Sequence, residues 1–237
     1  MRVLITGAAG QLGQALQQSC PDNVEVLALG RAELDLADPA ACRAAVETNR
    51  PDWVINAGAY TAVDRAEEEP ALAHQVNAEA PGALAAALDQ TGGALLQVST
   101  DFVFNGEQGH PYRPDQPCNP LGVYGRTKAA GEQAATAALS PERLAILRTS
   151  WVYGPVGHNF LLTMLRLHAI KAADGECLRV VADQVGCPTS TTTLARACWA
   201  ILDRANASVQ GPGLTALPCN PSTKTTVWPQ ALDSRAL

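Results

Sequence analysis

The chain has 237 residues, enough for one large domain or one and a half, and its 47% hydrophobic and 17% charged residues indicate a globular protein. A net charge of −6 and a pI near 5.2 argue against a general binding surface for nucleic acid or for an anionic membrane. The seven cysteines form no C-x-x-C pair and no metal-ligand spacing, and no signal peptide or apolar membrane span is recognisable. We therefore expect a cytoplasmic protein with reduced thiols.

Short apolar runs alternate with Ala-rich stretches over the first 150 residues. Buried strands are expected at 2–6, 24–29, 52–57, 94–99 and 144–150. Helices are expected between them at 11–20, 39–49, 70–90 and 121–139. This alternation predicts an α/β fold, in which residues 1–152 form a Rossmann-like, doubly wound parallel sheet with helices on both faces. Such sheets bind ligands beyond the carboxyl ends of their strands.

The sequence changes character after residue 152, and residues 153–237 are expected to form a smaller substrate-binding part. A helix at 159–170, a short strand at 178–183 and a helix at 191–205 are predicted, and the last helix can pack back on the first domain. The segment 211–237 holds four prolines and no regular periodicity, which predicts an irregular tail.

A glycine turn follows the first strand. Gly7, Gly10 and Gly13 have the spacing G-x-x-G-x-x-G and open the first helix. Glycine lets the backbone approach a pyrophosphate closely, and the amino terminus of a helix offers free N–H groups. The spacing favours a dinucleotide site over the alternative, an ordinary glycine-rich turn.

The residues at the end of the second strand should determine whether the protein prefers NADH or NADPH. An acid there binds the ribose 2′-hydroxyl of NADH, whereas arginine suits the 2′-phosphate of NADPH. This chain has Gly30 and Arg31 and no acid at that place. The absence favours NADPH, although Arg31 alone fits a solvated side chain equally well.

Tyr124 and Lys128 lie one helical turn apart in the segment 121–139. A lysine cation near a phenol lowers the pKa of the phenol, which can then exchange a proton with a reacting oxygen. The alternative is a solvated helix face. Ser99, Thr100 and Asp101 end the fourth strand, where they could bind a substrate oxygen beside Tyr124 or cap a turn.

A series of ordered segments extends these motifs: GAAGQLG, LDLADPA, NAGAYTAVDRAE, STDFVFNG, NPLGVYGRTKAAGE, RTSWVYG and DQVGCPT. With its glycine turn, Ser/Thr and Tyr-x-x-x-Lys pair, the chain resembles the extended short-chain dehydrogenase/reductases. Within that superfamily it resembles the dTDP-4-dehydrorhamnose reductase family, from the first residue to about residue 205.

The resemblance implies that NAD(P)H reduces the C4 ketone of dTDP-4-dehydro-L-rhamnose to dTDP-L-rhamnose, in dTDP-rhamnose biosynthesis. It assigns catalysis to Tyr124, Lys128 and Thr100, with Tyr124 protonating the C4 oxygen and Lys128 holding the nicotinamide ribose. Beside the glycine turn and Arg31, the implied cofactor-binding residues are Gln11, Leu12, Asp35, Leu36, Ala59, Tyr60 and Thr61, together with Tyr124 and Lys128. The implied substrate-binding residues are Thr100, Asp101, Trp151, Asn159, Phe160, Gln184 and Pro188.

The resemblance weakens near residue 210, where members of that family continue with a further helix-rich segment. The substrate part is therefore expected to be truncated, with apolar faces on 160–170 and 194–202 left partly exposed. Some members dimerise through Mg²⁺ bound by acidic residues, but the helix at 11–20 has no acid, so Mg²⁺ is not expected. The expected partner is a small-molecule sugar nucleotide, with no nucleic acid or membrane, and the expected state is a monomer or a weak homodimer.

Two other functions remain open from the sequence. One is a non-catalytic homologue that binds NADP(H) and regulates another enzyme. The other is a sugar-nucleotide epimerase of the same superfamily, which would use Tyr124 and Lys128 but keep its NAD bound.

Overall fold

A parallel sheet forms the centre of the computed structural model, which describes residues 1–180 and 184–210 and the short strand at 225–227. In spatial order its strands are β2 (Glu25–Leu29), β1 (Arg2–Thr6), β3 (Trp53–Asn56), β4 (Ala94–Thr100), β5 (Leu144–Thr149) and β8 (Thr225–Val227). All neighbouring pairs run parallel. The strand order reverses between β1 and β3, the point at which such sheets bind ligands.

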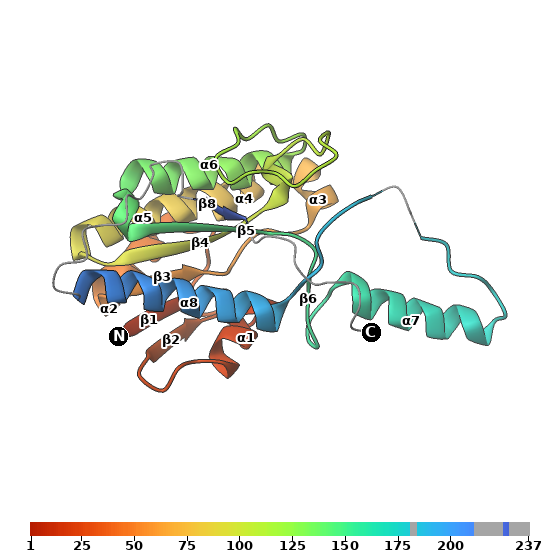
Figure 1. The fold of residues 1–237 in the computed structure, drawn as a ribbon, viewed down its shortest axis with the longest axis horizontal. Coiled ribbons are helices and arrows are strands. Elements are labelled where there is room, and N and C mark those ends of the chain that lie inside the picture. Colours follow the sequence, from red (N-terminus) through yellow and green to blue (C-terminus); the bar gives the residue numbers. More distant parts are fainter. Residues whose placement is uncertain (181–183, 211–224, 228–237) are drawn as a thin grey trace.

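Helices cover both faces of this sheet (Figure 1). One face carries α1 (Gln11–Gln18) and α8 (Thr191–Gln210), and the other carries α2 (Pro39–Asn49), α5 (Ala80–Thr91) and α6 (Val123–Ala138). In β1, Val3 and Ile5 belong to the core under α1 and α8, whereas Leu4 belongs to the core under α2 and α5. All three side chains are fully buried, because a parallel strand covered on both faces must be apolar on both.

Short helices connect the strands at the edge where a ligand would bind. Between β3 and α5 lie α3 (Val63–Glu68), α4 (Pro70–His74) and a π-helical turn, η1 (Gln75–Glu79). A 3₁₀ turn, η2 (Asp101–Val103), follows β4 at the same edge, whereas another, η3 (Pro141–Arg143), precedes β5 and lies at the opposite edge. Isolated π-helical turns are found frequently at functional sites, and η1 buries the polar side chain of Asn77.

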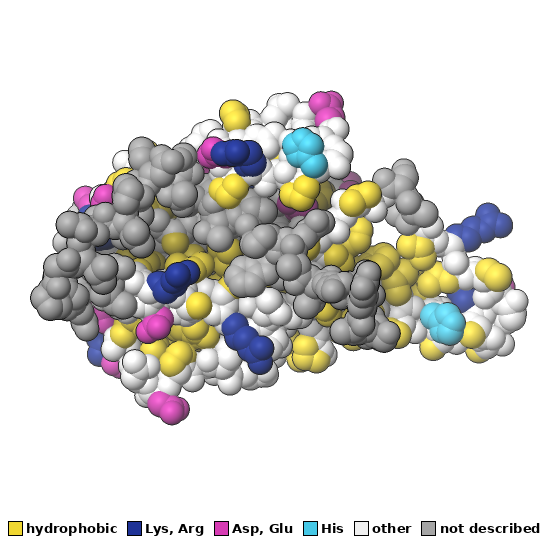
Figure 2. Space-filling view, viewed as in Figure 1, with side chains coloured by type: hydrophobic (Ala, Val, Ile, Leu, Met, Phe, Trp, Pro, Cys, Tyr) yellow, Lys and Arg dark blue, Asp and Glu magenta, His cyan; other side chains and the backbone are white. Residues whose placement is uncertain are grey.

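The region after β5 is built differently. Two short strands, β6 (Val152–Tyr153) and β7 (Thr189–Ser190), pair in parallel, and α7 (Phe160–Ala173) projects away from the sheet (Figure 1). No residue of α7 is buried, and Phe160 and Leu165 are 61% and 59% exposed. Figure 2 accordingly shows hydrophobic side chains on the surface of this projection.

Most of the expected elements are confirmed. The five strands and the helices predicted in the first 150 residues are present, and the helices predicted at 159–170 and 191–205 correspond to α7 and α8. Of the strand predicted at 178–183, residues 178–180 are not in a strand and 181–183 lie outside the described residues. In the segment expected to be irregular, residues 225–227 form β8, and the rest of 211–237 lies outside the described residues.

The exposure expected at 194–202 is wrong. Leu194, Trp199 and Leu202 are at most 7% exposed, because α8 lies on the sheet beside α1 and fills the core over Val3 and Ile5. Burying each such side chain contributes about 1.5–3 kcal/mol. The exposure expected at 160–170 is confirmed by α7. Among the described residues, no helix is both long and apolar enough to cross a membrane.

Candidate active site

The backbone of the glycine turn packs closely against the loop that follows β3. Gly7 has a φ of +64°, and a Cβ built on it would lie 2.6 Å from the Cα atom of Gly58. A Cβ on Gly13 would overlap the carbonyl oxygen of Gly7, so α1 can begin this close to the turn only because position 13 is glycine. The N-cap residue of α1, Gly10, has no side chain to occupy the first N–H groups, which leaves them free for an anionic ligand.

A cavity of about 180 Å³ opens beside this turn. Six of the predicted cofactor-binding residues line it: Gly7, Arg31, Asp35, Leu36, Ala59 and Tyr60. Sequence reasoning missed four other lining residues, Leu34, Gly58, Leu72 and Val76. Leu72 and Val76 come from α4 and η1, which lie in the segment 70–90 for which the sequence predicted only a helix. The cavity is concave and mainly apolar, with a few polar groups, as expected for a nucleotide site.

Leu12 and Gln11, two predicted cofactor-binding residues at the start of α1, do not line this cavity. Leu12 is buried in the core under α1, so only its backbone N–H can meet a ligand. The amide of Gln11 donates to the carbonyl oxygen of His158 (3.2 Å) and accepts from Asn159 (2.8 Å). Gln11 therefore joins the predicted cofactor turn to the predicted substrate part.

Asn77 fixes the loop that carries Ala59, Tyr60 and Thr61. Its side chain accepts from the backbone N–H of Tyr60 (2.9 Å) and donates to the carbonyl oxygen of Tyr60 (3.1 Å). It also donates to the Thr127 hydroxyl (3.2 Å), which ties the loop to α6. The Tyr60 hydroxyl donates to Glu69 (2.6 Å), and this hydrogen bond raises the pKa of the phenol. No sequence motif marked Asn77 as a support for this loop.

Thr100 and Tyr124 meet at the carboxyl end of β4. Thr100 is buried, and its hydroxyl donates to Asp101 (3.1 Å) and accepts from the backbone N–H of Phe102 (3.2 Å). Tyr124 is half-buried in the first turn of α6, and its ring meets the Phe102 ring edge-on at 5.5 Å. A Cβ on Gly125 would overlap the carbonyl oxygen of Phe102. The glycine after Tyr124 thus lets α6 approach this turn.

The protonation of Tyr124 differs from our expectation. Burial raises the pKa of the Tyr124 phenol, a hydrogen bond with Thr100 opposes this rise, and the Asp101 carboxylate adds to it. Burial likewise raises the pKa of Asp101. Our prediction of a lowered pKa for Tyr124 is wrong for this structure, because burial of the phenol outweighs the groups that would lower its pKa. The phenol therefore stays protonated at neutral pH, as a proton donor must.

Lys128 is more buried than Tyr124. Its side chain is 4% exposed, and the Nζ atom donates to the carbonyl oxygen of Val98 in β4 (2.8 Å). Burial lowers the pKa of Lys128 to about 8, while the negative charge of Glu132 acts in the opposite direction. Lys128 and Glu132 are four residues apart on α6, so Tyr124, Lys128 and Glu132 follow one face of the helix toward its carboxyl end.

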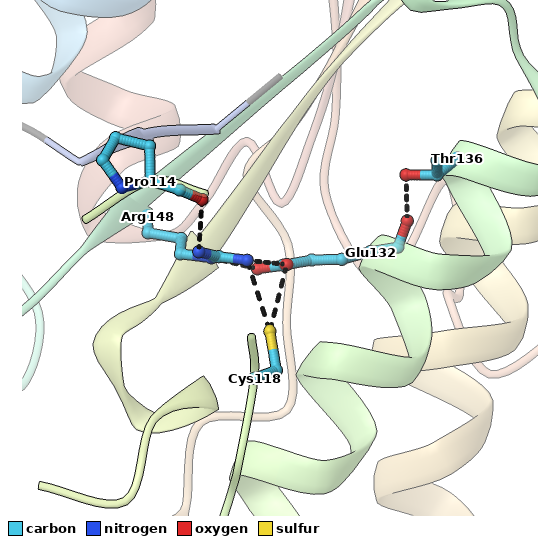
Figure 3. Close-up of polar contacts among 5 residues, drawn as sticks. All are labelled: Pro114, Cys118, Glu132, Thr136 and Arg148. Atoms are coloured by element: carbon cyan, nitrogen blue, oxygen red, sulfur yellow. Dashed lines mark hydrogen bonds and ion pairs between the residues drawn. The ribbon is translucent and has the colours of Figure 1, made fainter. Parts of the chain in front are cut away.

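Glu132 belongs to a buried ion pair that Figure 3 shows. Arg148 of β5 donates two parallel hydrogen bonds to the Glu132 carboxylate, at 2.9 and 2.6 Å. The guanidinium also contacts the Cys118 sulfur (3.3 Å) and the Pro114 carbonyl oxygen (3.3 Å), and it lies over the Phe104 ring. The pair therefore holds the loop between η2 and α6 against the sheet. Arg148 in the otherwise apolar run LAILRT was the sequence signal that we overlooked.

The predicted substrate-binding residues do not all gather at Tyr124. Thr100 and Asp101 do, whereas Asn159 caps α7 and donates to Gln11 and to the Gly154 carbonyl oxygen (2.9 Å). Trp151 is 43% exposed, has a φ of +47° and packs closely against Gly186. The remaining three, Phe160, Gln184 and Pro188, are exposed.

A Rossmann-like sheet with a glycine turn, a cavity beside that turn and a Thr–Tyr–Lys group is the arrangement of the extended short-chain dehydrogenase/reductase class. The model of the family "RmlD substrate binding domain" matches residues 1–227, and the chain belongs to this family. It is 50% identical over 195 residues to a dTDP-4-dehydrorhamnose reductase of Streptomyces griseus, an alignment that covers 82% of this chain and 62% of that protein. The chain thus spans less than two thirds of the length of this relative.

Solved structures agree with this family. The fold superposes on a dTDP-4-dehydrorhamnose reductase of Clostridium acetobutylicum with a TM-score of 0.81 and 42% identity, over 87% of this chain and 71% of that one. It superposes on the dTDP-4-dehydrorhamnose reductase of Bacillus anthracis in complex with NADP with a TM-score of 0.80 and 36% identity, over 85% and 71% of the two chains.

Proposed function

We propose that this chain is the catalytic core of an NADPH-dependent reductase that converts dTDP-4-dehydro-L-rhamnose to dTDP-L-rhamnose. The observation that carries the proposal is the arrangement of two groups at one edge of the sheet. The glycine turn and its cavity follow β1, β2 and β3, and the Thr100–Tyr124 pair follows β4. The relatives from Streptomyces griseus and Clostridium acetobutylicum are both named dTDP-4-dehydrorhamnose reductase, which supports the proposal.

The described residues fit a dinucleotide. The N–H groups at the start of α1 and the close approach of Gly7 to Gly58 accommodate a pyrophosphate, and the apolar walls of Leu36 and Val76 suit an adenine ring. A bound nicotinamide would supply hydride to the C4 carbon. The chain's own residues would then handle the oxygen: Thr100 hydrogen-bonds it, and Tyr124 gives it a proton.

Lys128 has a separate role in this proposal. Its ammonium group hydrogen-bonds the carbonyl oxygen of Val98 in β4, which fixes its position one helical turn after Tyr124. In that place it would hold a cofactor hydroxyl. Asp101 and Trp151 are the proposed contacts of the sugar nucleotide.

The test is the oxidation of NADPH, followed at 340 nm, with dTDP-4-dehydro-L-rhamnose as substrate. We expect turnover by the parent and a loss of about 10²–10⁴-fold in Tyr124→Phe, the range for a lost acid catalyst. Because Phe keeps the ring against Phe102, the variant should bind NADPH as the parent does. Equal turnover in the two proteins would remove Tyr124 from the mechanism.

A second candidate is a non-catalytic homologue that binds NADP(H). The observation that favours it is α7, none of whose residues is buried. The same experiment distinguishes the two proposed functions. A parent that binds NADPH but turns over no dTDP-sugar supports the second candidate and contradicts the first.

A further inference from the structure

Glu33 brings a carboxylate to the end of β2, where the linear sequence predicts none. The residues directly after β2 are Gly30 and Arg31, and Glu33 follows three residues after the glycine. The backbone N–H of Gly30 donates to the Oε2 atom of Glu33 at 2.9 Å. The side chain therefore folds back over the end of the strand.

The backbone holds this carboxylate in place. The N–H groups of Glu33 and Leu34 both donate to the carbonyl oxygen of Gly30, at 3.2 and 2.9 Å. Together with the Gly30–Glu33 hydrogen bond, they form a reciprocal arrangement of the capping-box type. A Cβ on Gly30 would lie 3.0 Å from Oε2, so glycine leaves room for the carboxylate. The negative charge is thus fixed before any ligand binds.

The carboxylate lies beside the predicted cofactor cavity. Arg31, Leu34 and Asp35, which surround Glu33 in the sequence, all line that cavity. On its other side Gly30 adjoins the glycine turn, since a Cβ on it would lie 3.8 Å from the Cβ atom of Ala9. In a dinucleotide bound to such a turn, the adenosine ribose lies at the end of β2. Arg31 and Glu33 therefore present opposite charges to the same part of the ligand.

We propose that Glu33 is a specificity-determining residue that opposes Arg31 in the choice between NADPH and NADH, an inference that rests on the proposed function. Glu33 accepts a hydrogen bond from the ribose 2′-hydroxyl of NADH and repels the 2′-phosphate of NADPH. Arg31 attracts that phosphate. A chain with both residues uses both cofactors, and its preference for NADPH is smaller than Arg31 alone would give.

The decisive variant is Glu33→Gln, because the Gln side-chain oxygen can still accept from Gly30 while the negative charge is gone. The measurement is the dissociation constant of NADPH and of NADH by fluorescence titration, without sugar nucleotide. We expect the ratio of NADPH to NADH affinity to rise about 3- to 30-fold, the effect of removing one charge near a phosphate in partly screened surroundings. Arg31→Ala should move the same ratio in the opposite direction.

Two controls separate charge from structure. Glu47→Gln makes the same chemical change on the exposed surface of α2 and should leave the ratio unchanged. Glu33→Ala removes both the charge and the hydrogen bond to Gly30, so it should raise the ratio while weakening the binding of both cofactors.

Three results would overturn the inference. The first is that Glu33→Gln leaves the ratio of NADPH to NADH affinity unchanged. The second is that Glu33→Ala weakens the binding of both cofactors equally, so that this ratio stays the same. Either result would mean that Glu33 only stabilises the turn after β2. If the parent binds neither NADPH nor NADH, the proposed function fails together with the inference. A parent that binds both cofactors with a ratio insensitive to Glu33 contradicts the inference alone.

Discussion

Helices α6 and α7 have opposite relations to the rest of the molecule. α6 buries seven of its residues, including the charged side chains Lys128 and Glu132. α7 consists mainly of apolar residues and buries none of them. The comparison shows that composition does not decide which helix is packed. α6 is packed because glycines and charge partners fit it to β4, β5 and η1, and α7 is attached chiefly through its N-cap, Asn159.

This difference separates the proposed cofactor side of the chain from the proposed substrate side. The proposed cofactor side contains α6, a filled core and a defined cavity, so its geometry is fixed without a ligand. The proposed substrate side contains α7, which buries no residue, and Gln184, which is exposed. We therefore expect substitutions under α6 to affect folding and cofactor binding, and substitutions on α7 to affect neither.

The largest effect is expected from breaking the ion pair beneath α6. In Arg148→Ala, the Glu132 carboxylate remains buried without its partner, which should lower the free energy of unfolding by about 3–5 kcal/mol. Urea denaturation measures this value. Glu25→Ala is the matched control, because the Arg2–Glu25 pair is exposed and should contribute only about 0–1 kcal/mol. Equal losses in the two variants would show that burial of the Glu132–Arg148 pair is unimportant.

The next effect concerns the pH dependence that Lys128 gives to folding. The pKa of Lys128 is lowered to about 8, below the usual value for an unfolded chain, so the unfolded state binds more protons above pH 8. Stability from this group therefore rises between about pH 8 and pH 10.4, by about 3 kcal/mol at most.

Lys128→Met isolates this contribution, since other titrating groups change both proteins alike. Urea denaturation at a series of pH values should show that the parent gains stability relative to the variant as the pH rises. If the difference between the two proteins stays constant from pH 7 to pH 10, the lysine is not buried as the structure shows.

Gly125→Ala tests the close contact between α6 and η2. The added methyl group would overlap the Phe102 carbonyl oxygen, so α6 must move away, at a cost of about 1–3 kcal/mol. Because Tyr124 precedes this residue, turnover should fall more than NADPH affinity does. Gly109→Ala is the control, since no atom lies within 4 Å of its added Cβ. Unchanged stability and turnover in Gly125→Ala would mean that α6 is not held against η2.

The sequence predicted the elements of this packed region better than it predicted their interactions. Alternation of apolar runs located β1 to β5, because buried parallel strands are continuous in sequence. The glycine turn located the cavity because its three glycines are also close together in sequence. The Glu132–Arg148 pair and the Gly30–Glu33 contact could not be predicted, since the first joins residues 16 positions apart through the fold and the second depends on a turn conformation. The burial of Lys128, which lowers its own pKa, also depends on tertiary packing.

The smallest effect is expected on α7, and it provides the sharpest test of the comparison. Leu165→Ser replaces a large apolar side chain that is 59% exposed, so little buried surface is lost and the free energy of unfolding should change by no more than about 0.5 kcal/mol. Leu84→Ser in α5 is the matched control: this side chain is fully buried in the core under α2 and α5, and the same change there should cost at least about 2–5 kcal/mol. The NADPH dissociation constant of Leu165→Ser should also equal that of the parent, because α7 lines no part of the cavity beside the glycine turn. If Leu165→Ser destabilises the chain as much as Leu84→Ser does, then α7 is packed in solution and the division between the two helices is wrong.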